Sequence, residues 1–179
     1  MEFIPTELPG VQVIRPRVFS DLRGGFVKTF HAPTFVAAGL GEFTPQEEFF
    51  STSHRNVIRG MHFQTPPHTQ ARLVSCLTGA ILDVVLDLRK GTATYGKVIT
   101  RELTSANREM IFIPEGFAHG FLSLADDTLV YYLASRPHSP PQDTGLSWNS
   151  FGFDWPVKDP ILSDRDKNFP SFQTFTSPF

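Results

Sequence analysis

The sequence predicts an all-β fold of the sandwich, jelly-roll or barrel type, with few helices. The 179 residues include 15 Pro and 13 Gly, and this helix-averse content excludes a helical bundle. Short β-prone runs separated by turn-forming residues fill most of the chain. The hydrophobic content of 40% can fill a core, so the chain is not disordered. The length fits one domain covering residues 1–179.

Seven segments have the length and composition of strands, and the connections between them carry turn-forming residues. These segments are Val11–Val18, Gly25–Phe30, Leu73–Thr78, Ala80–Leu88, Val98–Leu103, Met110–Ile113 and Thr128–Ser135. One helix is expected before the C-terminal tail, at His31–Leu40. This distribution of elements agrees with the all-β prediction.

Alternation of side chains indicates where a polar cavity would lie. In Ala80–Leu88 the even positions are apolar, whereas the odd positions include Asp83 and Asp87. Burying a carboxylate without a partner is costly, so we expect this face to meet solvent or to line a polar cavity. Tyr131 and Tyr132 point to opposite faces, so at most one of them can line such a cavity.

A second alternating segment, Gly60–Gln64, separates polar from apolar side chains. Met61 and Phe63 share one face and should pack in the core. His62 and Gln64 share the other face and are therefore expected to point toward the polar side, as site residues.

Charge and cysteine content exclude several classes of function. With 16 basic and 18 acidic residues the net charge is −2, which gives no electrostatic basis for binding nucleic acid or an anionic membrane. The single Cys76 excludes a disulfide framework and a Cys-rich zinc site, and favours a reducing compartment. Neither a membrane-length apolar run of about 20 residues nor a signal-peptide pattern is found, so we expect a cytoplasmic protein.

Two of the six histidines, His62 and His119, lie between apolar runs beside a glycine. From the local pattern alone they are either structural histidines or site residues. Pro114-x-Gly116-x-x-His119 resembles the second motif of the cupin jelly rolls. Metal-binding cupins use His-x-His in their first motif, where this chain has His62-Phe63-Gln64. Two histidines are too few for a zinc, iron or manganese site, so no metal is expected.

Further motifs extend this resemblance along nearly the whole chain. They are Asp21-x-Arg23-Gly24-x-Phe26, Ser51-x-Ser53, Val57 to Gln64, Asp83 to Arg89, Pro114 to Phe121, the strand of Tyr132, Asp154-Trp155-Pro156 and Leu162 to Asp166. Together they resemble the dTDP-4-dehydrorhamnose 3,5-epimerase family, which are metal-free cupins of deoxysugar biosynthesis. The resemblance implies a cupin-type jelly roll, no cofactor, and a nucleotide-linked 4-keto-6-deoxyhexose as substrate.

The chemistry of such a substrate requires a base and an acid on opposite faces of the sugar. The C4 ketone acidifies the hydrogens on C3 and C5, because the resulting carbanion is an enolate. By the resemblance, His62 is the base, Asp166 is the carboxylate that supports it, and Tyr132 is the acid. Arg72 stands where the family usually has a Lys facing the enolate oxygen.

The resemblance also implies substrate contacts. Arg59 matches a diphosphate ligand, His119 a second donor or a cavity wall, and Arg165 a substrate contact in the last motif. Arg23 and Phe26 resemble nucleotide contacts that reach over from a neighbouring subunit. A homodimer is therefore expected.

Four expected substrate positions depart from the family pattern. Lys28 replaces a Glu, Glu47 and Phe49 replace a Gln and an Asn, and His138 replaces a Tyr. The first three leave the nucleotide base open, whether thymine or another. The fourth leaves room for an enzyme that inverts only C3 or C5.

Two further alternatives remain. A related 3,4-ketoisomerase would share the fold, but such enzymes typically have a His-x-His that this chain lacks. A non-catalytic carbohydrate-binding cupin would need only an aromatic cavity, with no reason to hold His62, Asp166 and Tyr132 together.

Overall fold

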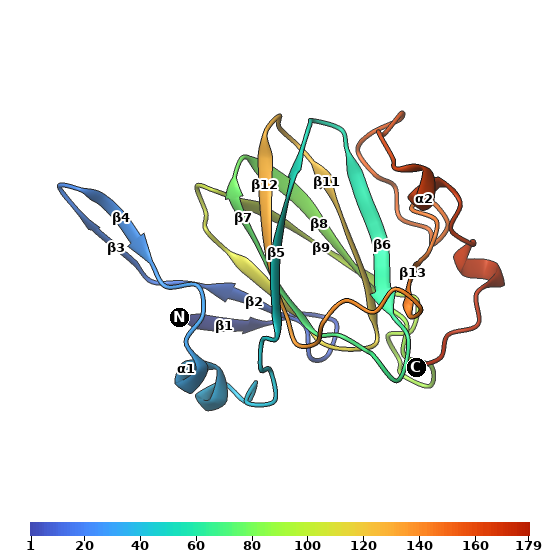
Figure 1. Ribbon diagram of the computed structural model, residues 1–179, viewed down its shortest axis with the longest axis horizontal. Helices are drawn as coiled ribbons and strands as arrows, with labels where there is room; N and C mark the ends of the chain where they lie inside the picture. The colour runs from blue at the N-terminus through green and yellow to red at the C-terminus, as the bar shows by residue number, and fades with distance from the viewer.

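Two antiparallel sheets face one another in the computed structural model, which describes residues 1–179 (Figure 1). The six-stranded sheet has the order β1 (Glu2–Pro5), β2 (Gln12–Arg15), β10 (Met110–Ile113), β7 (Arg72–Thr78), β12 (Thr128–Ala134) and β5 (Glu47–Ser53). The five-stranded sheet has the order β13 (Asp143–Gly145), β6 (Ile58–Gln64), β11 (Phe117–Ser123), β8 (Ala80–Asp87) and β9 (Val98–Thr104). This arrangement is a jelly roll, so the predicted all-β class is confirmed.

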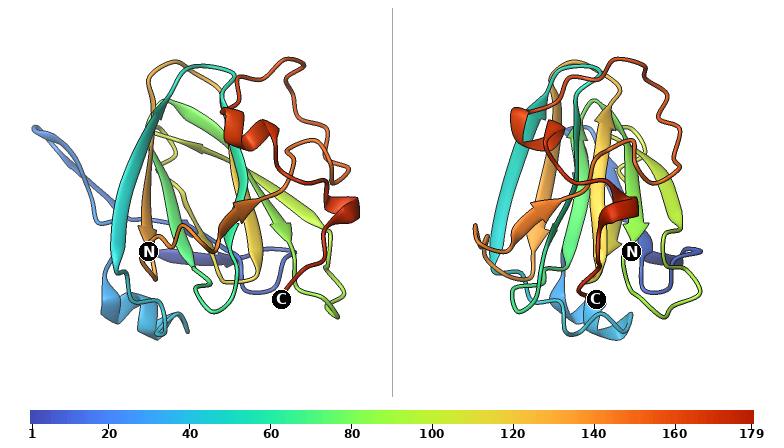
Figure 2. Two further views of the ribbon diagram at one scale, coloured as in Figure 1. Left: turned by 45° about the vertical axis from the view of Figure 1, so that its right-hand side comes forward. Right: turned by 90° about the vertical axis from the view of Figure 1, so that its right-hand side faces the viewer.

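The remaining elements are short. A hairpin of β3 (Val18–Asp21) and β4 (Gly24–Val27) projects away from the two sheets, in blue in Figures 1 and 2. The helices are α1 (Ala32–Ala37), α2 (Asp164–Lys167) and the 3₁₀ turn η1 (Phe172–Thr174). None of them has the length and apolar character needed to cross a membrane.

The strand predictions were wrong in detail at two places. The segment expected as one strand at Val11–Val18 is divided, because Pro16 has no N–H to donate and the chain leaves the sheet there. The strand expected at Gly25–Phe30 ends at Val27. The sequence also gave no prediction of β1, β5, β11 or β13. Strand β5 was missed because it is an edge strand rich in Glu, Ser and Thr.

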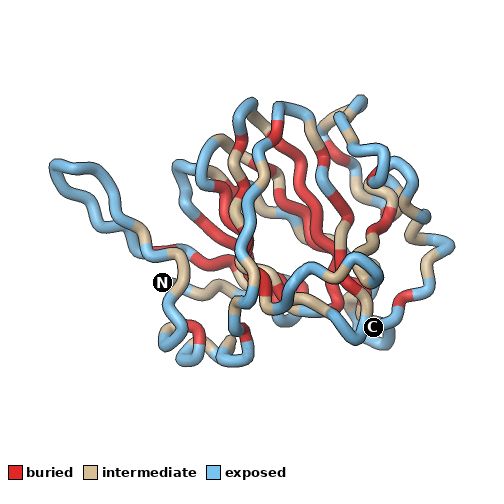
Figure 3. The backbone as a smooth tube through the Cα atoms, viewed as in Figure 1, coloured by how far each residue is buried: buried red, intermediate tan, exposed pale blue.

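Three apolar clusters stabilise the fold. Thirteen buried residues pack between the two sheets. The C-terminal segment, from Leu146 onward, covers the outer face of the five-stranded sheet, and α1 covers part of the outer face of the six-stranded sheet. Figure 3 shows buried residues concentrated in the central strands, whereas the hairpin is exposed except at Val27. Met61 and Phe63 belong to the outer cluster of the five-stranded sheet, as their alternation predicted.

A close approach between β6 and β11 fixes the register that builds the site. Gly60 has φ +150°, and a Cβ at this position would lie 2.6 Å from the Cα of Gly120. Only glycine fits both the conformation and the space. The ladder between the two strands is irregular beyond His119, and it pairs His119 with His62. Both imidazoles therefore emerge side by side from the five-stranded sheet.

Candidate active site

A cavity of about 370 Å³ lies between the two sheets. The lining side chains come from both sheets, from two of the connecting loops and from α2. They are Glu47, Phe49, Ser51, Arg59, His62, Gln70, Arg72, His119, Tyr132, His138, Asp143 and Arg165. Most of them are polar or charged, which suits a polar ligand better than an apolar one.

His62 and Asp166 form a hydrogen-bonded pair at one wall of the cavity. His62 Nε2 lies 2.9 Å from Asp166 Oδ1, and the Gly60 N–H donates to Oδ2 at 3.2 Å. The Ser163 side chain caps α2 by accepting from the Asp166 N–H at 3.1 Å. Asp166 is almost fully covered, whereas the His62 side chain is 26% exposed. With Nε2 engaged by the carboxylate, Nδ1 is the nitrogen left for proton transfer.

The environment keeps Asp166 ionised. Burial alone would raise the pKa of this carboxyl, but the hydrogen bond and charge of His62 and the Gly60 N–H outweigh it and lower the pKa below its ordinary value. An ionised Asp166 stabilises an imidazolium on His62, which a proton-abstracting base must become.

Tyr132 lies in the opposite sheet, on β12, and is buried. Burial is the main cause that raises the pKa of its phenol, the nearby Asp83 adds to the shift, and Arg72 and Arg59 partly oppose it. Tyr132 is thus a protonated donor at neutral pH. Tyr131 points away and donates to Glu48 Oε2 at 2.6 Å, which confirms the alternation prediction for this pair.

His119 and Asp83 form a second, more deeply buried pair. Their Nε2 and Oδ2 atoms lie 2.7 Å apart, with side-chain exposures of 4% and 0%. The odd face of β8 therefore turns inward, not to solvent. Asp83 lies directly behind the cavity residue His119, and the rings of His119 and Tyr132 meet edge to face with 6.1 Å between centroids.

Arg72 presents its guanidinium to the cavity. Its Nε donates to Gln70 Oε1 at 2.9 Å, which is its one side-chain hydrogen bond. Desolvation lowers the pKa of this guanidinium, with the neighbouring Tyr132, Asp143 and Glu47 acting in the opposite direction. Since the two Nη atoms have no protein partner, they are free to donate to an oxygen of a ligand.

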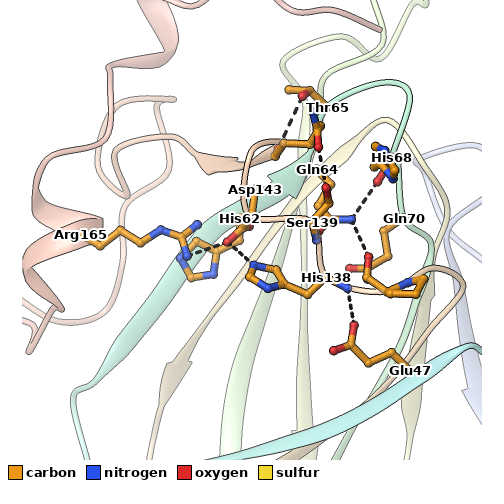
Figure 4. A network of polar contacts seen from close by, with 12 residues as sticks. Glu47, His62, Gln64, Thr65, His68, Gln70, His138, Ser139, Asp143 and Arg165 are labelled. Carbon is orange, nitrogen blue, oxygen red and sulfur yellow. Dashed lines mark hydrogen bonds and ion pairs between the residues drawn. The ribbon is translucent and has the colours of Figure 1, made fainter.

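A network of polar contacts joins several of the lining residues, and Figure 4 shows these contacts. Asp143 Oδ2 accepts from Arg165 Nη1 at 2.7 Å and pairs with His138 Nε2 at 3.1 Å. The His138 backbone N–H donates to Glu47 Oε2 at 2.6 Å. Burial would raise the pKa of Asp143, but the hydrogen bonds from Arg165 and His138 hold it below its ordinary value.

Arg59, on β6, is held against the end of β5 that carries Thr52 and Ser53. Its Nε donates to Ser53 Oγ at 3.0 Å and one Nη donates to the Thr52 carbonyl at 2.9 Å. The Ser51 hydroxyl, on the same face of β5 as Ser53, is buried beside the Tyr132 phenol and acts to lower the pKa of that phenol. A guanidinium that is fixed by hydrogen bonds suits an anionic group such as a phosphate.

Most residues expected from the sequence come together here. Nine of them line the cavity, and Asp166 lies behind His62; the nine are His62, Tyr132, Arg72, Glu47, Phe49, Arg59, His119, His138 and Arg165. Arg23, Phe26 and Lys28 lie instead on the projecting hairpin or just after it, where they are exposed and outside the cavity.

Gln64 does not line the cavity, although the alternation predicted that it would face the same side as His62. It is 3% exposed, its Nε2 donates to the His68 carbonyl at 2.8 Å, and its Oε1 accepts from the Ser139 N–H at 2.7 Å. The loop after β12 covers the end of β6, so Gln64 joins that loop to the sheet.

The sequence reading missed three lining residues. Ser51 shares a face of β5 with Glu47 and Phe49, and Gln70 precedes Arg72 by two residues, so alternation could have found both. Asp143 follows a Pro-rich loop and gave no local signal.

Comparisons with known proteins identify the family of the chain. A sequence profile described as dTDP-4-dehydrorhamnose 3,5-epimerase matches residues 5–174. The dTDP-4-dehydrorhamnose 3,5-epimerase of Shigella flexneri is 38% identical over 174 residues, which cover 96% of each chain.

Solved structures are similar over nearly the whole chain. The dTDP-6-deoxy-D-glucose-3,5-epimerase of Legionella pneumophila, in complex with dTDP-4-keto-L-rhamnose, has a TM-score of 0.92 at 30% identity, covering 98% of this chain and 94% of that one. A 3′-monoepimerase of Streptomyces bikiniensis, in complex with dTDP-quinovose, has a TM-score of 0.91 at 32% identity, covering 96% and 88%. The chain therefore belongs to the dTDP-4-dehydrorhamnose 3,5-epimerase family.

Proposed function

We propose that this protein inverts C3 and C5 of a nucleoside-diphosphate 4-keto-6-deoxyhexose, with dTDP-4-keto-6-deoxyglucose as the expected substrate. One observation carries the proposal. The His62–Asp166 pair and the Tyr132 phenol come from opposite sheets and face one cavity. Epimerisation needs this arrangement, because the proton leaves one face of the sugar and returns to the other.

The reaction follows from these positions. His62 Nδ1 takes the proton from C3 or C5, and the C–H electron pair moves into the enolate, with negative charge on O4. The Arg72 Nη donors stabilise that charge, while Asp166 stabilises the imidazolium. Tyr132 then protonates the same carbon from the other face and recovers its proton from solvent, as His62 releases the one it took.

The nucleotide part of the substrate is expected to bind beside Arg59, whose fixed guanidinium suits a diphosphate. Ser51 faces the same end of the cavity. Relatives of similar fold carry dTDP-sugars, which supports a nucleotide sugar as the ligand. Glu47 and Phe49 line the same cavity, so we expect them to influence which nucleotide base or sugar the protein binds.

We also propose a homodimer in which the hairpin of one subunit reaches the cavity of the other. Leu22 is fully exposed, Phe26 is 61% exposed and Phe19 is 49% exposed, and the rings of Phe19 and Phe26 meet at 6.3 Å between centroids. Large apolar side chains exposed together on one hairpin indicate an interface. This arrangement would bring Arg23 and Phe26 to the substrate, and Lys28 near it. Sedimentation at twice the mass of one chain is the expected result.

The free thiol of Cys76 agrees with a cytoplasmic enzyme.

A single-centre epimerase is the second candidate. It is favoured by His138, which takes part in a rim network with Asp143 and Arg165 where the family has a Tyr, and by the similarity to a 3′-monoepimerase. The rim would then hold the sugar in one orientation and expose one carbon to His62.

Exchange in D₂O separates these possibilities. The protein is incubated with 4-keto-6-deoxyglucose linked to dTDP, CDP, UDP or GDP, and proton NMR follows the C3 and C5 signals. Loss of both signals with one nucleotide is expected. Loss of one signal alone would select the single-centre enzyme, and no exchange with any nucleotide would overturn the proposed function.

A further inference from the structure

Phe169 lies outside the cavity but contacts two of its functional residues. Its ring meets the His62 imidazole edge to face, with 5.7 Å between centroids and 72° between planes. The Arg165 guanidinium lies over the same ring, 5.2 Å from its centroid. The phenyl ring thus joins the base to a charged group at the cavity rim.

A slot in the neighbouring strand holds this ring. Gly145 on β13 is paired directly with His62 on β6. A Cβ on Gly145 would lie 2.5 Å from Phe169 Cε2 and 2.7 Å from the Met61 carbonyl oxygen. The missing side chain at Gly145 therefore makes the space beside His62 that Phe169 fills.

The backbone around Phe169 is anchored on both sides. Ser163 caps α2, which carries Arg165 and Asp166. Immediately after the ring, the Pro170 carbonyl accepts a hydrogen bond from the Ser147 N–H at 2.8 Å. These contacts leave the ring little freedom to move out of the slot.

The two contacts complete the positioning of both side chains. Asp166 fixes His62 at Nε2 but leaves rotation of the imidazole plane open, and an edge-to-face aromatic contact restricts that rotation. Arg165 is 48% exposed, so its one ion pair with Asp143 would leave a mobile guanidinium, which the aromatic face restrains.

We propose that Phe169 is a positioning residue that holds the His62 imidazole and the Arg165 guanidinium in a fixed arrangement around the sugar. The proposal rests on the proposed function, because it assigns His62 as the base. Small errors in the placement of a base are costly in rate, since a displacement of about 1 Å can reduce turnover about 100-fold.

The test compares three variants by kcat, KM and deuterium exchange. Phe169→Leu keeps an apolar side chain but loses the aromatic contacts, and we expect kcat to fall about 10- to 100-fold with a smaller change in KM. Phe169→Tyr keeps the ring and should retain kcat within about threefold. Phe175→Leu is the matched control, because Phe175 lies in the same C-terminal segment and meets Phe63, at 5.5 Å between centroids, instead of a cavity residue.

Three outcomes would overturn the proposal: a wild-type kcat in Phe169→Leu, an equal loss of kcat in Phe175→Leu, or no recovery in Phe169→Tyr. A second readout does not depend on activity. The ring-proton NMR signals of His62 should move and broaden in Phe169→Leu but not in Phe175→Leu; unchanged signals would contradict the proposal even if no substrate were turned over. Absence of exchange by the wild-type protein would instead count against the proposed function.

Discussion

Phe49 and Tyr132 are directly paired across β5 and β12, and their rings stack face to face with 4.7 Å between centroids and 13° between planes. Phe49 is 39% exposed, whereas Tyr132 is 6% exposed. Phe49 therefore covers the ring of the proposed acid on its solvent side. Since burial is the main cause of the raised pKa of Tyr132, this stack helps to keep the phenol protonated.

Replacing Phe49 should affect both stability and the pH dependence of turnover. Phe49→Asn is expected to lower the free energy of unfolding by about 1 kcal/mol through loss of the stacked pair. It should also let the pKa of Tyr132 fall toward the ordinary value of about 10, so that activity declines at lower alkaline pH than in the wild type. Urea unfolding and a pH profile of kcat/KM measure the two effects. Phe50→Asn, on the other face of β5, is the control, and a common alkaline limb in all three proteins would refute this role.

Acid stability should depend on Asp166. Its pKa is lowered in the folded protein, so its ionisation stabilises the fold above the unfolded pKa of about 4. That stabilisation is lost as the pH falls through the lower, folded pKa. Urea unfolding at a series of pH values below about 4 should therefore show a shallower pH dependence in Asp166→Asn than in the wild type. An unchanged slope would show that Asp166 is not linked to folding.

Arg72 should act mainly on turnover. Arg72→Gln removes the charge that faces the developing oxyanion, and kcat is expected to fall about 100- to 1,000-fold. Arg72→Lys retains a charge but loses the hydrogen bond to Gln70, so a loss of about tenfold or less is expected. Steady-state kinetics of both variants decide the point: equal losses would mean that geometry, not charge, determines the contribution of Arg72.

Gly60 should tolerate no side chain. In Gly60→Ala the new Cβ would meet the Gly120 backbone, which cannot move aside as a flexible side chain could. A loss of unfolding free energy of at least about 3 kcal/mol is expected. Gly91→Ala is the control, since Gly91 also has positive φ but open space around it, and the conformational strain alone should cost about 1 kcal/mol. Similar unfolding midpoints for the two variants would show that the close approach has little effect.

Part of this site could be predicted from the sequence because its residues lie in motifs or on alternating faces. His119 stands beside Gly120 and His62 follows Gly60 by two residues, both within strands, and the alternation around Tyr132 correctly separated it from Tyr131. Family resemblance connected Asp166 to His62, although 104 positions separate them in the chain.

Other features depend on contacts that no local pattern records. The covering of Gln64 by the loop after β12 and the joining of Asp143 to His138 and Arg165 require the folded chain. The slot for Phe169 likewise exists only because Gly145 is brought beside His62 by strand pairing. These contacts join residues that are far apart in the chain. The alternation of side chains along a strand and the residues typical of turns describe only neighbouring positions, so they carry no information about such contacts.

The most direct test of the account is the count of solvent deuterons that enter the substrate after His62 has removed its protons. The wild-type protein, incubated in D₂O with dTDP-4-keto-6-deoxyglucose, should give a nucleotide sugar that is heavier by two deuterons in the mass spectrum. His62→Asn should give no mass gain while still binding dTDP. Retained incorporation in His62→Asn would contradict the assignment of His62 as the base, and no incorporation by the wild type would contradict the epimerase mechanism itself.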